Sequence, residues 1–248
     1  MHHLCVKLAD LRIRIAHRHP DLAAALAPYR AARGSTDFCA AATKRAMREI
    51  ARRSSFRPTP GYAESLVVFE EICEQMPLHD GIMLHAACIA AEGRAYAFLA
   101  PSGTGKTTHM MLWMDALAAR AVIINGDKPF VRFVGGAPHA YGNPWAGKEG
   151  FHQNIRAPLA ALCFIERGQG NSIRRLNARE VLPRLIQQVY MPRREQPLDH
   201  TLALVDRLAR SVDAYALRCT ASREAAQLAM DRMMNRDRAA EYARAQGG

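Results

Sequence analysis

The sequence predicts an α/β protein, with an α/β core around a phosphate-binding loop and a small α+β lobe before it. Two observations support this prediction. Apolar runs of strand length alternate with amphipathic runs of helix length along most of the chain. A glycine-rich segment, residues 100–108, stands between one such strand and one such helix. The chain has 248 residues, of which 49% are hydrophobic, enough for one full core.

The organisation along the chain suggests three parts. We expect an N-terminal accessory lobe at residues 1–60, a core domain at residues 61–236 and a frayed tail at residues 237–248. In the lobe, residues 11–15 alternate aliphatic and charged side chains, which indicates a strand, and a short Ala/Leu helix ends near Tyr29. The lobe shows no catalytic constellation, so we expect it to dock a substrate or to act as a scaffold.

The core domain begins after a basic linker that contains proline, residues 52–60. Residues 62–76 form an amphipathic pattern, with apolar residues at steps of three and four and four glutamates expected on the opposite, solvent face: Glu64, Glu70, Glu71 and Glu74. Residues 81–90 and 94–100 predict a hairpin that turns at Glu92-Gly93. His85 lies in its first strand and is either a hydrogen-bonded core residue or a catalytic group.

The loop after this hairpin reads A-P-S-G-T-G-K-T-T, one position from the common phosphate-loop pattern, with Ala100 in place of the first glycine. Glycines let successive backbone amides turn toward phosphate oxygens, Lys106 reaches the β- and γ-phosphates, and the Thr107 hydroxyl coordinates Mg²⁺. The following helix, residues 107–117, aims its positive end at the same anion. The nucleotide-binding residues predicted here are Ser102, Gly103, Thr104, Gly105, Lys106, Thr107 and Thr108. The alternative is a plain Gly/Ser-rich turn.

A carboxylate follows the next buried strand. Residues 121–127 are aliphatic and end in Asp127, which is typical of the second half of a Mg²⁺–nucleotide site and makes Asp127 a candidate metal ligand with Thr107. The alternative is an ordinary turn aspartate. The segment 141–150, which continues to Asn154 and Arg156, combines glycines, one tryptophan and several charges. Loops of this composition often contact substrate, although an ordinary long loop fits it equally well.

The rest of the chain continues the alternation of strands and helices. We expect strands at residues 159–165 and 214–218, and helices from Asn177, where Glu180 completes a capping box, at residues 199–210 and at residues 223–234.

Composition narrows the choice of partners and compartment. The net charge of +11 and the pI of about 9.8 favour anionic partners such as nucleotides, acidic peptides or nucleic acid. The basic clusters carry no interleaved aromatic residues, so we do not expect nucleic acid to be the partner. No segment approaches the ~20 apolar residues of a membrane span, and no signal core is visible, so we expect a cytoplasmic protein without a membrane partner. The six scattered cysteines, without a C-x-x-C pair, are expected to be buried reduced thiols rather than zinc ligands or disulfides.

Four segments together resemble the HPr kinase-like family, whose core is related to phosphoenolpyruvate carboxykinase. They are Leu84-His85, the loop at residues 100–108, the strand end N-G-D-K-P at residues 125–129, and Y-G-N-P-W-A-G-K-E-G at residues 141–150. The chain is similar, more narrowly, to small homologues from peptide gene clusters, including those that phosphorylate the C-terminal Ser of lasso peptide precursors. The resemblance runs from His85 to the last helix and leaves the N-terminal lobe uncovered.

The resemblance implies a catalytic domain that transfers the γ-phosphate of ATP, with Mg²⁺, to a hydroxyl of a peptide or protein, with Ser as the expected acceptor. It implies that Asp127, His85 and Lys106 are the catalytic residues. The family usually has two adjacent acidic residues at the end of this strand; here the first is Gly126, so Asp127 either does both jobs or holds Mg²⁺ while His85 accepts the proton. Residues expected to contact the transferred group or the substrate are Lys128, Lys148, Asn154 and Arg156.

Two other functions remain open from the residues alone. The same core supports phosphorylation of a small metabolite, and the positive charge allows a nucleotide-dependent regulatory or nucleic-acid-binding module. The resemblance to true HPr kinases implies a homo-oligomer, although the different N-terminal lobe weakens this expectation.

Overall fold

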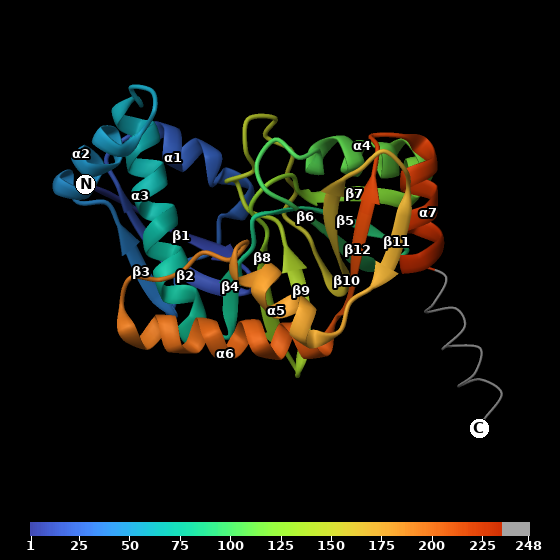
Figure 1. The fold of residues 1–248 in the computed structure, drawn as a ribbon. Helices are drawn as coiled ribbons and strands as arrows, with labels where there is room; N and C mark the ends of the chain where they lie inside the picture. Colours follow the sequence, from blue (N-terminus) through green and yellow to red (C-terminus); the bar gives the residue numbers. More distant parts are fainter. Residues whose placement is uncertain (235–248) are drawn as a thin grey trace.

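The computed structural model describes residues 1–234, so the expected tail at 237–248 and the end of the predicted core domain lie outside the described residues. Figure 1 shows an N-terminal lobe beside a large sheet with helices on both of its faces. The lobe contains a small sheet of β1 (His2–Leu8), β2 (Leu11–His17) and β3 (Phe38–Ala41), in the order β1-β2-β3. Strand β1 is antiparallel to β2, and β3 is parallel to it.

Three helices complete this lobe: α1 (Pro20–Ala25), α2 (Lys44–Arg53) and α3 (Pro60–Gln75). Aliphatic side chains on one face of β2, such as Ile13 and Ile15, pack with Val68 and Ile72 of α3 in one core cluster. This cluster extends across residue 60 and reaches Phe130 in the large sheet. The lobe and the start of the core domain therefore share a hydrophobic core, while the boundary at residue 60 stays a prediction.

The large sheet has the order β4-β8-β9-β10-β6-β5-β7, with β12 paired to β10 and β11 to β12. Its strands are β4 (Gly81–Met83), β5 (Ala86–Ala91), β6 (Arg94–Leu99), β7 (Ala121–Asn125), β8 (Phe130–Val134), β9 (Ala137–Tyr141), β10 (Arg156–Arg167), β11 (Ser172–Arg175) and β12 (Asp213–Cys219). The long strand β10 joins two regions. Its first residues pair antiparallel with β9, and the rest lies parallel between β6 and β12.

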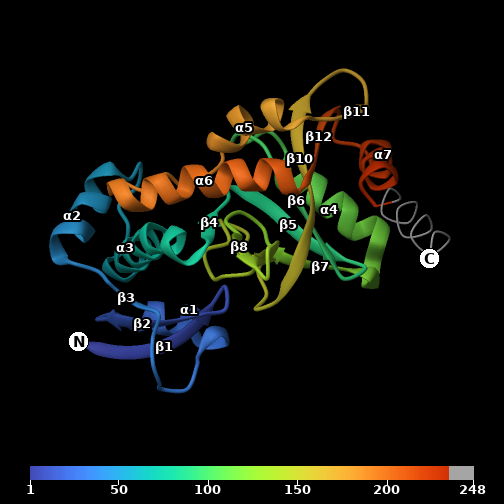
Figure 2. The same ribbon diagram turned by 90° about the horizontal axis from the view of Figure 1, so that it is seen from below.

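Helices cover both faces of this sheet because its central strands are apolar on both sides. Along β6, Ala97 and Leu99 face one core cluster, whereas Tyr96 and Phe98 face another. The first cluster is covered by α5 (Ala178–Ile186) and α6 (Glu195–Ser211), and the second by α4 (Lys106–Leu117) and α7 (Arg223–Met233). Helix α6 runs along the side of the molecule from the N-terminal lobe to the large sheet (Figure 2).

Most of the predicted elements are confirmed. The β5–β6 hairpin pairs Ala91 with Arg94, and the capping box at Asn177 and Glu180 begins α5. The mixed α/β class is confirmed as well. Four cysteines, Cys73, Cys88, Cys163 and Cys219, are buried free thiols as expected, whereas Cys39 is exposed and Cys5 is half-buried. In the described part of the chain, no helix has the length and apolar character needed to cross a membrane.

The expectation that all four glutamates of α3 face solvent is wrong for two of them. Glu64 is fully buried, where it accepts hydrogen bonds from the backbone amides of Arg18 and His19. Glu74 is also buried and accepts from the Arg193 amide at 2.8 Å. Buried carboxylates need compensating donors, which here come from distant parts of the chain, although within residues 1–234 Glu74 Oε2 has no hydrogen bond and only an ion pair with Arg194, at 3.7 Å.

Candidate functional site

The loop between β6 and α4 has the backbone conformation that its glycines permit. Gly103 and Gly105 have φ angles of +76° and +119°, in the left-handed region that residues with a side chain avoid. Gly105 precedes the first residue of α4, and this helix has no side-chain cap at its N-terminus. The first amides of a helix have no partner within it, so this end of α4 is suited to an anion.

Lys106 is the first residue of α4 and is largely buried behind the loop. Its Nζ donates to the Ala100 carbonyl at 2.8 Å. Burial lowers the pKa of Lys106, and the charge of Lys128 acts in the same direction, whereas Asp127 raises it. Burial disfavours the charged form of Lys106, and a bound anion would stabilise that form, which fits a phosphate-binding role.

Asp127 is placed by an asparagine that sequence reasoning missed. Asn125, fully buried at the end of β7, accepts hydrogen bonds at its Oδ1 from the backbone amides of Asp127 at 2.9 Å and Lys128 at 2.6 Å. Its Nδ2 donates to the Asn143 carbonyl at 3.0 Å. This side chain closes an Asx-type turn around Gly126, and the N-G-D sequence is the signal that could have identified it.

Two basic side chains engage the Asp127 carboxylate. His85 Nε2 lies 3.3 Å from Oδ1, and Lys128 Nζ pairs with Oδ2. Burial raises the pKa of Asp127, but the hydrogen bonds from His85 and Lys128 outweigh it and lower the pKa to about 2. On its other side, His85 Nδ1 lies 3.2 Å from Gln188 Oε1. The imidazole is therefore held between Asp127 and Gln188.

A cavity of about 1130 Å³ brings most of the predicted site residues together. Those that line it are His85, Ser102, Gly103, Gly105, Lys106, Thr107, Thr108, Asp127, Lys128 and Lys148. Thr104 lines a neighbouring cavity of about 370 Å³. Asn154 and Arg156 line neither. Asn154 donates to the Pro28 carbonyl at 2.8 Å, and Arg156 pairs with Asp10, so both side chains join the N-terminal lobe to the large sheet.

The far wall of the larger cavity comes from the N-terminal part of the chain, which the motifs did not indicate. It includes Asp21 and Ala25 of α1 and Tyr62, Leu66 and Phe69 of α3.

Trp145, which belongs to the segment 141–150, packs against this wall. Its ring centroid lies 4.9 Å from that of Phe69, and its Nε1 donates to Ser65 Oγ at 3.0 Å. The tryptophan expected in a substrate-contacting loop is therefore mostly buried against α3.

The smaller cavity lies on the other side of the phosphate loop, at the carboxyl ends of the parallel strands β6, β10 and β12. Arg167 donates to the carbonyls of Gly103 and Thr104 and so ties the loop to the end of β10. His109 also lines this cavity and is nearly fully buried. Burial lowers its pKa to about 4, so the imidazole is neutral and accepts a hydrogen bond from Trp113 Nε1 at 3.1 Å.

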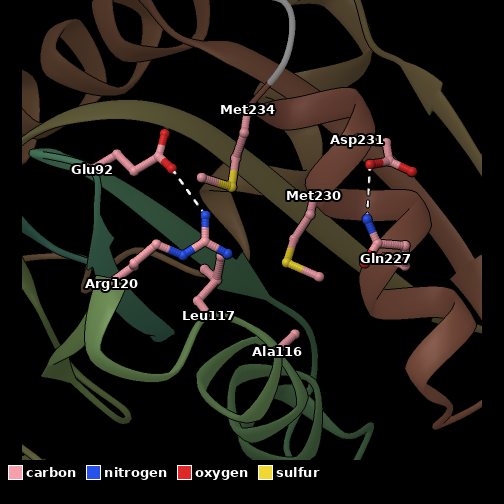
Figure 3. A pocket seen from close by; sticks show the side chains of 8 residues that line it. All are labelled: Glu92, Ala116, Leu117, Arg120, Gln227, Met230, Asp231 and Met234. Carbon is pink, nitrogen blue, oxygen red and sulfur yellow. Dashed lines mark hydrogen bonds and ion pairs between the residues drawn. The ribbon is translucent and has the colours of Figure 1, made fainter.

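A third hollow, of about 150 Å³, lies between the end of α4 and α7 (Figure 3). The side chains around it include the Glu92–Arg120 ion pair, at 3.4 Å, and the Gln227–Asp231 hydrogen bond, at 2.9 Å. None of the predicted site residues lines this hollow, so the candidate site is the large cavity at the phosphate loop.

Residues 151 and 152, which follow the segment 141–150, also connect the large cavity to the N-terminal lobe. Tyr29, almost fully buried, has its hydroxyl 2.8 Å from His152 Nδ1. His152 forms an antiparallel bridge with Asn125, and the neighbouring Phe151 carbonyl accepts from the Gly126 amide at 2.8 Å. The turn that carries Asp127 is thus held from the side by this segment.

The chain was compared with protein families, curated proteins and solved structures. No protein-family model and no curated protein matches the chain. Among solved structures, the chain is similar to the Hpr(Ser) kinase/phosphatase from Coxiella burnetii, with 8% sequence identity and a TM-score of 0.41, over 66% of this chain and 95% of that one.

Proposed function

We propose that this protein is a phosphotransferase that moves the γ-phosphoryl group of ATP to a serine hydroxyl of a peptide or protein. The observation that carries the proposal is the meeting, in one cavity, of an uncapped helix start, a buried Lys106 and an ionised Asp127. Phosphoryl transfer requires this combination because its catalysis is mainly positioning and neutralisation of charge. The resemblance described above further suggests the C-terminal Ser of a lasso peptide precursor as the acceptor.

The roles of the residues follow from their chemistry. The loop amides and Lys106 hold the phosphates, and the base of the nucleotide would extend toward the smaller cavity beside Arg167. The acceptor oxygen attacks the γ-phosphorus, the bond to the bridging β–γ oxygen breaks, and the hydroxyl proton leaves toward Asp127 or His85. A carboxylate whose pKa is about 2 is a weak base, so orienting the hydroxyl and binding metal suit Asp127 better than early proton removal.

The residues present also fit Mg²⁺. Thr107 and Asp127 line the same cavity and offer a hydroxyl and an ionised carboxylate, which are the hard oxygen donors that Mg²⁺ prefers. Magnesium sites in kinases use one or two carboxylates together with substrate phosphates, which is what this pair allows. When bound, the ion would neutralise charge on the phosphates.

The direct test is incubation of the full chain with ATP, Mg²⁺ and a panel of serine-containing peptides, with peptide mass and ADP release as readouts. We expect ADP release matched by the addition of one phosphate to a serine. Phosphorylation of free metabolites alone would replace the peptide by a small molecule as the acceptor. Nucleotide binding without transfer to any hydroxyl, combined with salt-sensitive binding to nucleic acid, would overturn the proposal.

A further inference from the structure

The apolar surface of helix α3 continues from the core into the wall of the large cavity, since Phe69 belongs to the core cluster and Leu66 packs against it. Its residues in the wall of the large cavity are Gly61, Tyr62, Ser65, Leu66 and Phe69. These positions recur at three- and four-residue steps and therefore share one face of the helix. The core-facing residues Val68 and Ile72 are aligned with Gly61 and Ser65, seven positions earlier, whereas Tyr62, Leu66 and Phe69 form a stripe on the neighbouring side of the helix. One side of α3 therefore packs into the protein while another borders the cavity that holds Asp127.

This stripe is aromatic and only partly covered. The side chain of Tyr62 is 48% exposed, and its ring lies 5.8 Å from that of Phe56, which is 56% exposed. Leu66 is half-buried beside them, and Phe69 and Trp145 form the floor. Exposed aromatic residues that gather at the edge of a cavity are typical of a binding surface.

The wall offers little to a ligand rich in hydroxyls. Ser65 already accepts the indole N–H of Trp145, and the other polar groups on this side of the cavity are the Asp21 carboxylate and the hydroxyls of Thr59 and Tyr62. A sugar-like acceptor needs several hydrogen-bonding partners, because buried hydroxyl groups without partners are costly. A peptide with apolar side chains next to its serine meets no such penalty.

The size of the cavity points the same way. At about 1130 Å³ it exceeds the ~300–1,000 Å³ typical of sites for one small molecule. The phosphate loop and Lys106 form one side of it, and α1 and α3 form the opposite side. An acceptor that reaches Asp127 beside a bound nucleotide therefore lies against α3.

We propose that the exposed stripe of α3, centred on Tyr62 and Leu66, is the acceptor-binding surface, and that it takes a peptide segment with aliphatic or aromatic side chains flanking the serine. This inference rests on the proposed function. It assigns the N-terminal part of the chain a direct role in choosing the substrate.

The test uses the full chain and two fluorescein-labelled peptides that each contain one serine. Phenylalanine and leucine flank the serine in one peptide and glycines flank it in the other, and the remaining residues are identical. Tyr62→Ala and Leu66→Ala are compared with Leu202→Ala, which removes a similarly exposed side chain from α6 outside the cavity, and with Tyr62→Phe, which keeps the ring. Fluorescence anisotropy measures peptide binding without nucleotide. Steady-state transfer gives KM and kcat, and calorimetry gives ATP affinity.

We expect the apolar peptide to bind equally well to wild type and Leu202→Ala, and about tenfold more weakly to Tyr62→Ala and Leu66→Ala. In these two alanine variants the KM for the peptide should rise, whereas kcat and the affinity for ATP should not change. Tyr62→Phe, which keeps the ring, should lose less affinity than Tyr62→Ala. Equal binding of both peptides, or unchanged affinity in both alanine variants, would overturn the inference even if transfer proceeds. Loss of transfer with intact, Tyr62-dependent peptide binding would count against the proposed function alone.

Discussion

His85 and Asp127 face each other across the base of the large cavity, with His85 Nε2 3.3 Å from Asp127 Oδ1. They come from different strand ends, the break between β4 and β5 and the turn after β7. Lys128 engages the other carboxylate oxygen, so both oxygens are paired before any ligand binds. A hydroxyl or a metal ion that binds Asp127 must therefore compete with, or replace, one of these two side chains.

Asp127→Asn should abolish phosphoryl transfer, whereas His85→Ala should weaken it less. The amide keeps the shape of the side chain but removes the charge that orients a hydroxyl or binds Mg²⁺, a loss of about 10²–10⁴ in kcat. ADP release and peptide mass measure both variants. The opposite order of effects would make His85 the main base.

Lys106→Ala should lower the affinity for ATP by about ten- to a hundredfold, because a charge-assisted contact to the phosphates is lost. Isothermal titration calorimetry measures this change. Lys44→Ala, which removes an exposed lysine from the first turn of α2, is the matched control and should bind ATP as wild type does. Unchanged ATP affinity in Lys106→Ala would contradict the assignment of the phosphate loop.

Gly147→Ala should reduce transfer at least about tenfold by displacing Asp127. Gly147 has a φ of +77°, and a Cβ there would lie 3.0 Å from Asp127 Cβ and 3.2 Å from its Oδ2. Gly150→Ala is a close control, since Gly150 also has a positive φ, of +66°, but a Cβ there would meet nothing within 4 Å. Both variants should lose about 1 kcal/mol of stability, and only the first should lose activity. Equal losses of activity would show that backbone strain, not contact with Asp127, is responsible.

The free energy of unfolding should fall as the pH drops from about 6.5 toward 4 because of His109. Its pKa is lowered from 6.5 to about 4 by burial, so in this window the unfolded chain binds a proton that the native chain does not. The full effect is roughly 3 kcal/mol. Urea unfolding at several pH values, compared with His109→Gln, isolates this contribution. Parallel pH profiles for the two proteins would show that His109 is not buried in its neutral form.

Local motifs allowed the glycine turn before α4 and the β5–β6 hairpin to be predicted, because each is specified by residues close together in sequence, whereas phosphate binding by this loop and the role of Asp127 stay predictions. The burial of Glu64 and Glu74 could not be predicted in this way, since the amides that satisfy them lie 46 and 119 positions away. The stripe at Tyr62 and Leu66 was hidden for a related reason. An amphipathic pattern shows that a helix has an apolar face, but it does not reveal that a second face borders a cavity.

Strands β8 and β9 and the first strand, β1, were also missed. In β8 and β9 the chain reads F-V-R-F-V and A-P-H-A-Y around Gly135-Gly136, so the runs are short and one contains proline. Their pairing with each other and with β10 decides their structure, and tertiary context of this kind overrides local preference.

The contact between Tyr29 and His152 has a consequence for any shorter version of the protein. The backbone of His152 forms an antiparallel bridge with Asn125, whose side chain in turn fixes the amides of Asp127 and Lys128. A chain trimmed to begin at residue 61 would leave His152 without the phenol and would uncover the apolar side of α3. We therefore expect Asp127 to be displaced in the trimmed chain and the trimmed chain to aggregate, because residues 1–60 support the turn at the candidate site.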